Sequence, residues 1–566
     1  MAQWPRIACL IGVSFASFVS TRAQDKPPSA ARPGDQGFVN WIADGGTSRS
    51  QRFSPLDQIN VENVATLTKA WEARLGGGLP SSTPLVIDGV IYAHLAGYDI
   101  RALNAATGQE SWRYTYGTPA APARSDAPAA APAGRGGGAG GGGRGAGVGR
   151  GLATGNGQLY FGTRTGELVA VSATSGKEQW RSPVEESEPF DRTVQKAGAI
   201  IAPPVFVKGL IVTGSNGGDA AYRGRLVAVD ARDGKERWRF NVVPGPGEKG
   251  HETWTGDGWK YGGGAPWLTG SYDPDLNLLY WGTGNASSDF SGGARKGDNL
   301  YTASIVALRP ETGELVWHFQ TTPHDVWDWD AAYETILVDR PVDGTLRKLL
   351  VQPNKNGFMY VLDRTNGKYL GAWKYIQNLT WTSGLDDKGV PQNRREPTQG
   401  SPIVICPDYF GGRSWNQAAF SPVTGLIYNH GSERCAEFTS VPEEPRVGQR
   451  FVAGAQRTIE PISGGPIVGH IDTIDPVTGR RAWQYPLKAP LLAPLLATQG
   501  NLIFTFDNGA AALIALDAQS GEKLWSTPLD LTRGGAISYS VNGKQFIAIL
   551  SSSPDGAVLT AYSLPN

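Results

Sequence analysis

One short stretch of this 566-residue chain gathers side chains that could support redox or metal chemistry. It runs from Gly262 to Asp330 and contains GGGAPW, YDPDLNLLYWGTGN and TPHDVWDWD. Short apolar runs that end in glycine-rich turns are typical of strands, so Trp267, Asn285 and Asp328 are expected in loops at strand ends. An aromatic face, an amide oxygen and carboxylates suit a flat redox cofactor bound beside a metal ion. We therefore interpret this stretch as a candidate redox site.

The composition favours many short strands. The chain has 75 glycines, 39 prolines and 18 tryptophans but only two methionines, and its apolar runs are short and bounded by glycine. These features predict an all-β fold. The formal net charge is zero and no block of like charge is present, which argues against nucleic acid or an anionic membrane as a partner.

The N-terminus has the features of an export signal. Arg6 precedes an apolar run from Ile7 to Val19, and small residues lead up to Ala23. We expect residues 1–23 to be a signal peptide, residues 24–36 a flexible linker, and the protein to be periplasmic with no membrane span after cleavage. An uncleaved anchor is the alternative, although the run is short for a bilayer.

Cysteine usage points to one disulfide. Removal of the signal peptide leaves Cys406 and Cys435, and an oxidising compartment would join them. Such a loop is worth roughly 3–4 kcal/mol in the entropic model. Two buried free thiols remain the alternative. The sequence contains no C-x-x-C-H motif, so no haem c is attached to this chain and electrons must leave to a separate carrier.

A repeated phrase sets the predicted architecture. It has the form apolar-x-Ala-x-Asp-x-x-Thr-Gly-x-x-x-Trp and is clearest in Arg225 to Trp238 and Ala512 to Trp525. Each copy predicts a strand, a hairpin turn, and a tryptophan that starts the next strand on a buried face. Variants end at Trp112, Trp180, Trp317, Trp373 and Trp483, which makes seven copies.

An eighth copy is expected to join the two ends of the chain. Trp71 would lie on its last strand, and the other strands would come from Gln545 to Leu564. Eight copies predict an eight-bladed β-propeller with tryptophan-docking repeats over residues 37–566. The Gly/Ala-rich segment 117–147 does not fit the repeat and is expected to be an inserted mobile loop.

The motifs together resemble the pyrroloquinoline quinone (PQQ)-dependent alcohol dehydrogenases. The resemblance runs from about Asn40 to the C-terminus and includes the segment Arg52 to Trp71 and the central stretch described above. It implies an eight-bladed propeller that binds PQQ and one calcium or lanthanide ion. It also implies oxidation of an alcohol or sugar hydroxyl, with a separate cytochrome c or quinone as the electron acceptor.

The resemblance assigns roles to individual residues. Asp328 matches the base that accepts the proton of the alcohol, and Lys355 matches the cation beside the quinone oxygens. Trp267 matches the aromatic floor under the quinone. Further cofactor contacts are implied for Arg150, Gly217, Gly218 and Asn416, and metal ligands for Asp219, Asn285, Asp328 and Asp330. Asp325 is interpreted as a turn residue.

The chain departs from the family around the cofactor. Asp219 stands where a longer glutamate is usual, and Arg144 and Gly145 stand where many members have adjacent cysteines. Ser81, Leu492 and the segment Ser551 to Gly556 also replace family residues at the lid. These changes suggest a pocket of larger or different shape. The competing hypothesis is a propeller that has lost its cofactor and serves as an interaction scaffold.

Overall fold

The computed structural model of the protein describes residues 38–77, 81–117, 149–184, 198–342, 344–446 and 448–565. The predicted signal peptide (1–23), the linker (24–36) and the insertion from residue 118 onward lie outside the described residues, so those assignments stay predictions. Within the described part of the chain no α-helix occurs, only strands and four short 3-10 helices. The helices are η1 (Val64–Thr66), η2 (Ala96–Tyr98), η3 (His251–Thr253) and η4 (Gly258–Tyr261). The all-β prediction is confirmed.

Eight sheets of four or five strands form the body of the molecule. One sheet contains β4 (Leu85–Ile87), β5 (Val90–His94), β6 (Ile100–Asn104) and β7 (Glu110–Tyr114). The next contains β8 (Ala153–Gly155), β9 (Gln158–Gly162), β10 (Glu167–Ser172) and β11 (Glu178–Pro183). A third contains β12 (Val205–Val207), β13 (Leu210–Gly214), β15 (Arg225–Asp230) and β16 (Glu236–Asn241). The fourth sheet contains β18 (Ser271–Asp273), β19 (Leu278–Gly282), β20 (Ser304–Leu308) and β21 (Leu315–Gln320). The fifth contains β22 (Ile336–Val342), β23 (Thr345–Pro353), β24 (Phe358–Asp363) and β25 (Lys368–Lys374). The sixth contains β29 (Ala419–Ser421), β30 (Leu426–Glu433), β33 (Val468–Ile474) and β34 (Arg481–Leu487).

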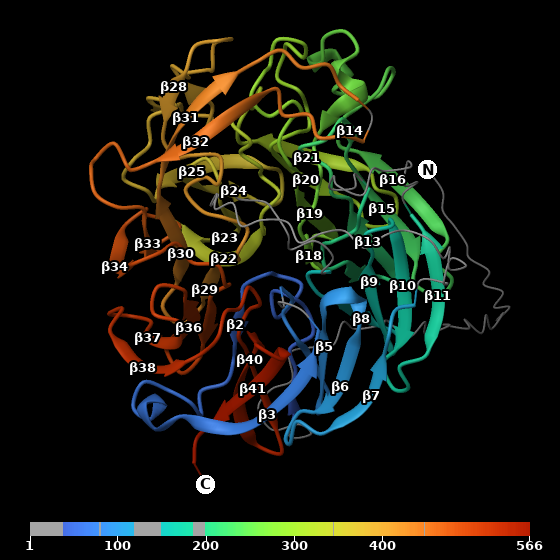
Figure 1. Ribbon diagram of the computed structural model, residues 1–566, viewed down its shortest axis with the longest axis vertical. Coiled ribbons are helices and arrows are strands. Elements are labelled where there is room, and N and C mark those ends of the chain that lie inside the picture. The colour runs from blue at the N-terminus through green and yellow to red at the C-terminus, as the bar shows by residue number, and fades with distance from the viewer. Residues whose placement is uncertain are drawn as a thin grey trace, which may run out of the picture.

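The last two sheets combine strands from both ends of the chain. β2 (Phe53–Ser54) joins β35 (Leu496–Thr498), β36 (Leu502–Asp507), β37 (Ala512–Asp517) and β38 (Lys523–Pro528). β1 (Phe38–Val39) and β3 (Thr68–Gly76) flank β39 (Ile537–Val541), β40 (Lys544–Ser553) and β41 (Gly556–Ser563). β3 pairs antiparallel with β41, as predicted from Trp71, and the two strands lie side by side at the bottom of Figure 1, near the C-terminus. The sheets surround a common centre, which is the propeller architecture, and their number is compatible with eight blades (Figure 1).

Smaller elements lie outside these sheets. β14 (Tyr222–Arg223) pairs with β17 (Gly262–Gly263), and β26 (Gly384–Leu385) pairs with β27 (Pro391–Gln392). β28 (Ile403–Ile405), β31 (Cys435–Ser440) and β32 (Gly454–Ile459) form a three-stranded sheet. The predicted disulfide between Cys406 and Cys435 is present and ties the end of β28 to the start of β31.

The repeated tryptophans dock each sheet onto the next. Each indole Nε1 donates a hydrogen bond of 2.8–3.2 Å to a backbone carbonyl, and seven of these carbonyls belong to the turn of the following repeat. The pairs are Trp71 with Ala105, Trp112 with Ala173, Trp180 with Ala231, Trp238 with Pro310, Trp317 with Arg364, Trp373 with Pro476, Trp483 with Ala518, and Trp525 with Leu67. Since Leu67 directly precedes β3, the strand that carries Trp71, the bond from Trp525 connects the last sheet of the series to the sheet of the first tryptophan.

Candidate functional site

The predicted site residues share one end of the sheets. In an antiparallel sheet, the loop before the first strand and the loop after the second strand lie at the same end. Asp219, Asn285 and Lys355 follow the second strands β13, β19 and β23, whereas Arg150, Trp267, Asp328 and Asn416 precede the first strands β8, β18, β22 and β29. The strand order therefore brings side chains from distant repeats to one face.

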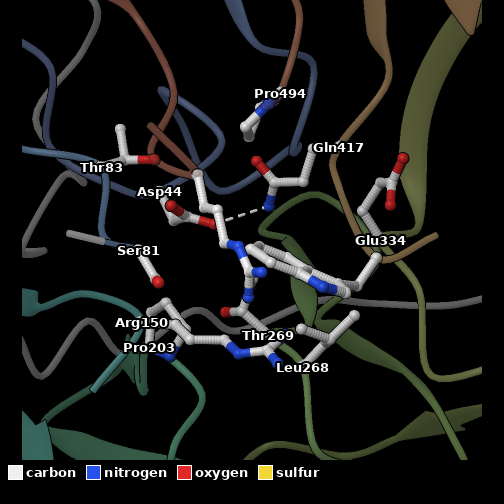
Figure 2. Close-up of a pocket in the computed structure, with 12 residues that line it drawn as sticks. Asp44, Ser81, Thr83, Arg150, Pro203, Leu268, Thr269, Glu334, Gln417 and Pro494 are labelled. Atoms are coloured by element: carbon white, nitrogen blue, oxygen red, sulfur yellow. Dashed lines mark hydrogen bonds between the residues drawn. The ribbon is translucent and has the colours of Figure 1, made fainter. Parts of the chain in front are cut away.

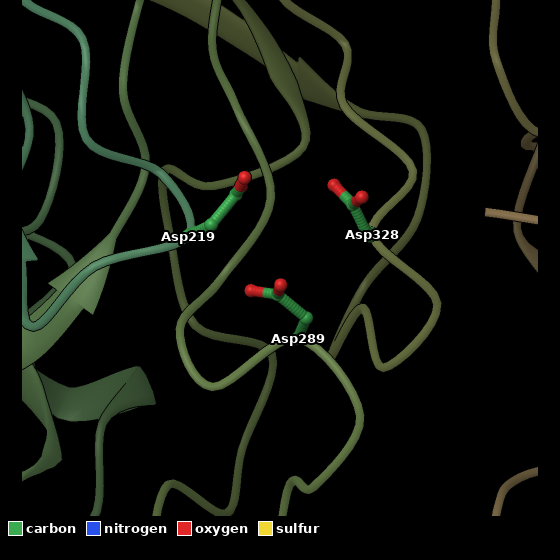
Figure 3. A group of neighbouring side chains, drawn as sticks. All are labelled: Asp219, Asp289 and Asp328. Atoms are coloured by element: carbon green, nitrogen blue, oxygen red, sulfur yellow. The ribbon is translucent and has the colours of Figure 1, made fainter. Parts of the chain in front are cut away.

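Three carboxylates converge at this face. Asp219, Asp289 and Asp328 each contribute an oxygen, and these oxygens all lie within 4.8 Å of one another. Figure 3 shows the three side chains pointing toward a common space from separate loops. Asp289 is fully buried, whereas Asp219 reaches solvent. Oxygen-rich clusters of this kind suit a hard cation such as calcium or a lanthanide.

Asn285 adds an amide to the same cluster. Its Nδ2 donates a hydrogen bond of 2.9 Å to Asp289 Oδ1, and its Oδ1 is buried without a hydrogen-bond partner. A β-carbon added to Gly218 would lie 2.6 Å from that oxygen, so a side chain is excluded there. An orphaned buried oxygen costs free energy unless a ligand satisfies it. The arrangement therefore fits the predicted metal ion.

Lys355 joins Asp328 to Asp330. Its Nζ lies 3.1 Å from Asp328 Oδ1 and 3.0 Å from Asp330 Oδ2, and all three side chains are nearly buried. Burial raises the pKa of Asp328, and repulsion from Asp219 and Asp330 adds to the rise against the attraction of Lys355. Burial opposes the charge on Lys355, but the two carboxylates raise its pKa overall. Lys355 therefore stays charged between the two carboxylates.

Asp330 is held by three protein donors. Its Oδ1 accepts hydrogen bonds from Trp267 Nε1 at 3.0 Å and from the Asn285 backbone amide at 3.2 Å, while its Oδ2 faces Lys355. Asp330 is not one of the three converging carboxylates. In this structure it positions the indole of Trp267 and the loop of Asn285. Its predicted role as a metal ligand stays a prediction.

The loop that carries Asp328 is fixed from within. Asp325 accepts hydrogen bonds from the backbone amides of Trp327 at 3.1 Å and Trp329 at 2.8 Å, which agrees with its interpretation as a turn residue. Both indoles are fully buried. Asp328 has φ 62°, a left-handed conformation that non-glycine residues rarely adopt. Such conformations persist where the surroundings enforce them, often at functional sites.

A cavity adjoins the cluster on the side of Trp267. It is lined by Asp44, Ser81, Thr83, Arg150, Pro203, Leu268, Thr269, Glu334, Trp415, Gln417, Pro494 and Arg533. Figure 2 shows Arg150 and Thr269 facing the same space as Asp44 and Ser81. Trp267 contacts Arg150 on the cavity side and Asp330 on the cluster side, so it links the two parts of the site.

Arg150 has the features of an anion receptor. Its guanidinium lies between two indoles, 4.6 Å from the ring centre of Trp267 and 4.2 Å from that of Trp415. Its Nη1 is buried without a hydrogen-bond partner, and so is Nε of Arg533, which also lines the cavity. Burial lowers the pKa of Arg150 to about 10, which leaves it charged at neutral pH. Two cationic groups, each with a buried nitrogen that has no hydrogen-bond partner, fit the carboxylates of PQQ.

Several residues of the site escape prediction from the sequence. Asp289 lies four positions after Asn285, but nothing in NASSD separates it from an ordinary turn aspartate. Three residues that line the cavity lie outside the repeated phrase: Asp44 near the N-terminus, Arg533 near the C-terminus, and Trp415 in the long segment between Trp373 and Trp483. Asn416 was predicted and lies between two lining residues; its Nδ2 donates to the Leu491 carbonyl at 2.9 Å, and its Oδ1 has no partner.

Comparison with known proteins decides the family. Residues 41–402 match the family model named PQQ, which is described as the β-propeller domain of glucose, ethanol and alcohol dehydrogenases. The chain is 35% identical over 545 residues to the quinohemoprotein alcohol dehydrogenase ADH-IIG of Pseudomonas putida, covering 90% of this chain and 72% of that protein. This chain belongs to the PQQ-dependent alcohol dehydrogenase family. A second family member, the quinoprotein alcohol dehydrogenase PedH of Pseudomonas putida, is 32% identical, covering 90% of this chain and 85% of that protein.

Solved structures of the family have the same fold. The ADH-IIG structure from Pseudomonas putida superposes with a TM-score of 0.79 at 32% identity, covering 93% of this chain and 80% of that one. A europium-containing methanol dehydrogenase superposes with a TM-score of 0.81 at 27% identity, covering 93% of this chain and 98% of that one.

Residues 468–562 also match the model of the outer membrane protein assembly factor BamB. In the described residues no helix is long and apolar enough to cross a membrane.

Proposed function

We propose that this family member is an exported PQQ- and metal-dependent dehydrogenase that oxidises a hydroxyl group of an alcohol or a sugar. The observation that carries the proposal is the continuity of the site. The carboxylate cluster, the Lys355 contacts, Trp267 and the arginine-lined cavity form one connected set of side chains. When bound, PQQ and its ion would supply a two-electron acceptor and a Lewis acid.

Each part of the chain has a task in this proposal. Arg150 and Arg533 would bind the cofactor carboxylates, and Trp267 would support its ring. Because the Arg150 guanidinium now lies against Trp267, it would have to turn toward those carboxylates when the ring stacks. Asp219, Asn285 and Asp328 would hold the ion, and Asp330 would keep Trp267 and Asn285 in place.

Asp328 is the group proposed to take the proton of the substrate hydroxyl. Burial and the neighbouring carboxylates raise its pKa, which favours acceptance of a proton, and Lys355 at 3.1 Å keeps the carboxylate oriented. Electrons would leave to a separate cytochrome c or quinone. A pocket without the lid residues usual in the family favours alcohols larger than methanol as substrates.

Reconstitution tests the proposal. Purified protein is incubated with PQQ and either calcium or lanthanum, and the quinone absorbance and dye reduction are followed with methanol, longer alcohols and sugars. We expect quinone binding and alcohol-dependent dye reduction with at least one ion. Failure of both with every ion would overturn the enzyme proposal. Faster oxidation of methanol than of larger substrates would overturn only the larger-pocket hypothesis.

The scaffold hypothesis is the second candidate. The match to the BamB model over residues 468–562 favours it. That segment contains none of the residues from Arg150 to Asn416 to which the site roles are assigned. A scaffold also gives no reason for a buried carboxylate cluster with an unsatisfied amide oxygen beside it. We therefore place the dehydrogenase first.

A further inference from the structure

Asp289 is a buried carboxylate to which the proposed dehydrogenase site gives no task. It lies in the loop between β19 and β20 and is 2% exposed. Within the described residues, its side chain makes one hydrogen bond, from Asn285 Nδ2 to Oδ1, and no ion pair. A buried carboxylate without a cation is costly unless a positive ligand compensates its charge.

The geometry of the cluster matches a shared ion. Ligand oxygens bonded to one calcium-sized ion at about 2.3–2.6 Å can lie no farther apart than about 5 Å. The oxygens of Asp219, Asp289 and Asp328 lie within 4.8 Å of one another, so each pair meets this limit. The three carboxylates leave a space between them (Figure 3).

An independent observation points to the same ligand. The side-chain oxygen of Asn285 is fully buried and has no hydrogen-bond partner, while the amide nitrogen of the same group is bonded to Asp289. Lys355 is the basic group paired with the cluster, and it contacts Asp328 and Asp330. Asp219 and Asp289 make no close ion pair in the described part of the chain, and Lys355 and the exposed Arg450 attract them only from a longer distance.

We propose that Asp289 is a direct ligand of the metal ion and compensates for the short side chain of Asp219. This inference rests on the metal site of the proposed function. Four acidic side chains, Asp219, Asp289, Asp328 and Asp330, surround one contacting lysine, Lys355, so acidic groups outnumber the basic group at the site. An excess of negative charge favours a trivalent ion over a divalent one. Asp289 therefore biases the site toward a lanthanide over calcium.

The test measures metal binding rather than turnover. Terbium chloride is titrated into the wild-type protein and into the Asp289→Asn variant, with and without PQQ, and the tryptophan-sensitised terbium emission is recorded. Calcium competition gives the relative affinity for the divalent ion. Because affinity follows the number of charged ligands, we expect the terbium affinity of D289N to fall by at least about tenfold and the calcium affinity to fall less.

Two further variants separate ligand loss from misfolding. Asp289→Glu keeps the carboxylate, so it should retain more of the terbium affinity than D289N does. Asp298→Asn removes an exposed aspartate of the neighbouring segment and should bind terbium like the wild type. The melting temperature of metal-free D289N should match or exceed that of the wild type, because the change removes repulsion among carboxylates.

Several results would overturn the inference. These are unchanged terbium affinity in D289N, an equal loss in D298N, or no terbium binding by the wild type in either condition. The outcome is separable from that of the proposed function. If the wild type oxidises alcohols but D289N binds the metal as the wild type does, only the assignment of Asp289 as a ligand is contradicted. If terbium binding depends on Asp289 but no alcohol is oxidised, only the proposed dehydrogenase function is contradicted.

Discussion

At the scale of single residues, Asp328 is subject to three constraints at once. Its backbone has φ 62°, its side chain is nearly buried, and one of its oxygens lies 3.1 Å from Lys355. Aspartate and asparagine tolerate this backbone region better than most residues do. The conformation turns the carboxylate toward Asp219 and Asp289. The loop thus presents a base and a metal ligand in one side chain.

Replacing Asp328 by asparagine tests the proposed base. The substitution keeps the size and the tolerance for positive φ but removes the proton acceptor. We expect turnover to fall roughly a hundredfold to ten-thousandfold while quinone absorbance persists. Steady-state dye reduction by the reconstituted enzyme is the measurement, with Asp298→Asn as the matched control at an exposed position. Undiminished turnover would remove Asp328 from the role of base.

At the scale of the elements, the tryptophan and the turn it docks on form the structural unit. Gly367 has φ 76°, and a β-carbon there would lie 2.6 Å from Cε3 of Trp317. The same contact recurs at Gly108, Gly176, Gly234, Gly313, Gly479 and Gly521, each against the tryptophan of the preceding sheet. The glycine therefore serves both the left-handed turn and the close approach of the indole.

The Gly367→Ala variant separates these two demands when compared with Gly209→Ala. Gly209 has φ 77°, but no atom lies within 4 Å of an added β-carbon. Both variants carry the backbone cost of about 1–2 kcal/mol, and only Gly367→Ala displaces a tryptophan, which adds about 1–3 kcal/mol. Urea unfolding compares the two. Equal destabilisation would show that the docking contact contributes nothing at this turn.

His470 on β33 links two strands through charge. Its Nδ1 lies 3.0 Å from Asp472 Oδ2 and its Nε2 lies 3.4 Å from Glu433 Oε1 on β30. Burial lowers the pKa of His470, but the two carboxylates outweigh it and raise the pKa to about 9. Since this pKa exceeds the unfolded value of about 6.5, the stabilisation is complete below pH 6.5 and is lost as the pH rises through 9.

The His470→Gln variant checks this sign. We expect a loss of about 2–3 kcal/mol in unfolding free energy at pH 6 and a clearly smaller loss at pH 10. Urea denaturation at the two pH values gives both numbers, and His251→Gln, whose imidazole contacts the Pro244 carbonyl, serves as the control. A loss that stays constant from pH 6 to pH 10 would contradict the charged pair.

The sequence supports these elements unequally. The docking repeat is predictable because the spacing from turn glycine to tryptophan is local and recurs, and the structure confirms the predicted Trp71 strand beside the C-terminal strand. The positions of Trp267, Asn285, Asp328 and Lys355 at one face follow from strand ends. Asp289 and Arg533 are not predictable, because their proximity to the site depends on how individual loops fold back and no periodicity records that.

At the scale of the whole molecule, stability depends on closing the ring. β3 pairs with β41 from Thr68 to Gly76, and Trp525 donates to the Leu67 carbonyl at 3.2 Å. Closure removes the exposed strand edges that an open array of sheets would present. The strands on either side of the seam contribute to one core cluster, which contains Trp71 from β3, Tyr539 from β39 and Tyr562 from β41.

Deleting residues 556–566 tests the contribution of closure. The change removes β41 and leaves β3 without its partner, although none of the deleted residues is among those named at the carboxylate cluster or the cavity. We expect a loss of cooperative unfolding and loss of terbium and quinone binding, measured by urea denaturation and titration. Deletion of residues 565–566 keeps β41 and should behave as the full chain does. A cooperative, ligand-binding 556–566 deletion would show that closure is dispensable.

Because β3 pairs with β41, the sheet at the seam is continuous, and the chain ends could be moved to another loop without changing the fold. A circularly permuted gene could connect the C-terminal segment to Phe38 and begin instead at the Gly209 hairpin between β12 and β13, at the end of the sheet opposite the site loops. Every loop of the site would then remain unbroken, and the new termini would offer a point for tethering an electrode or an electron-accepting domain away from the site loops.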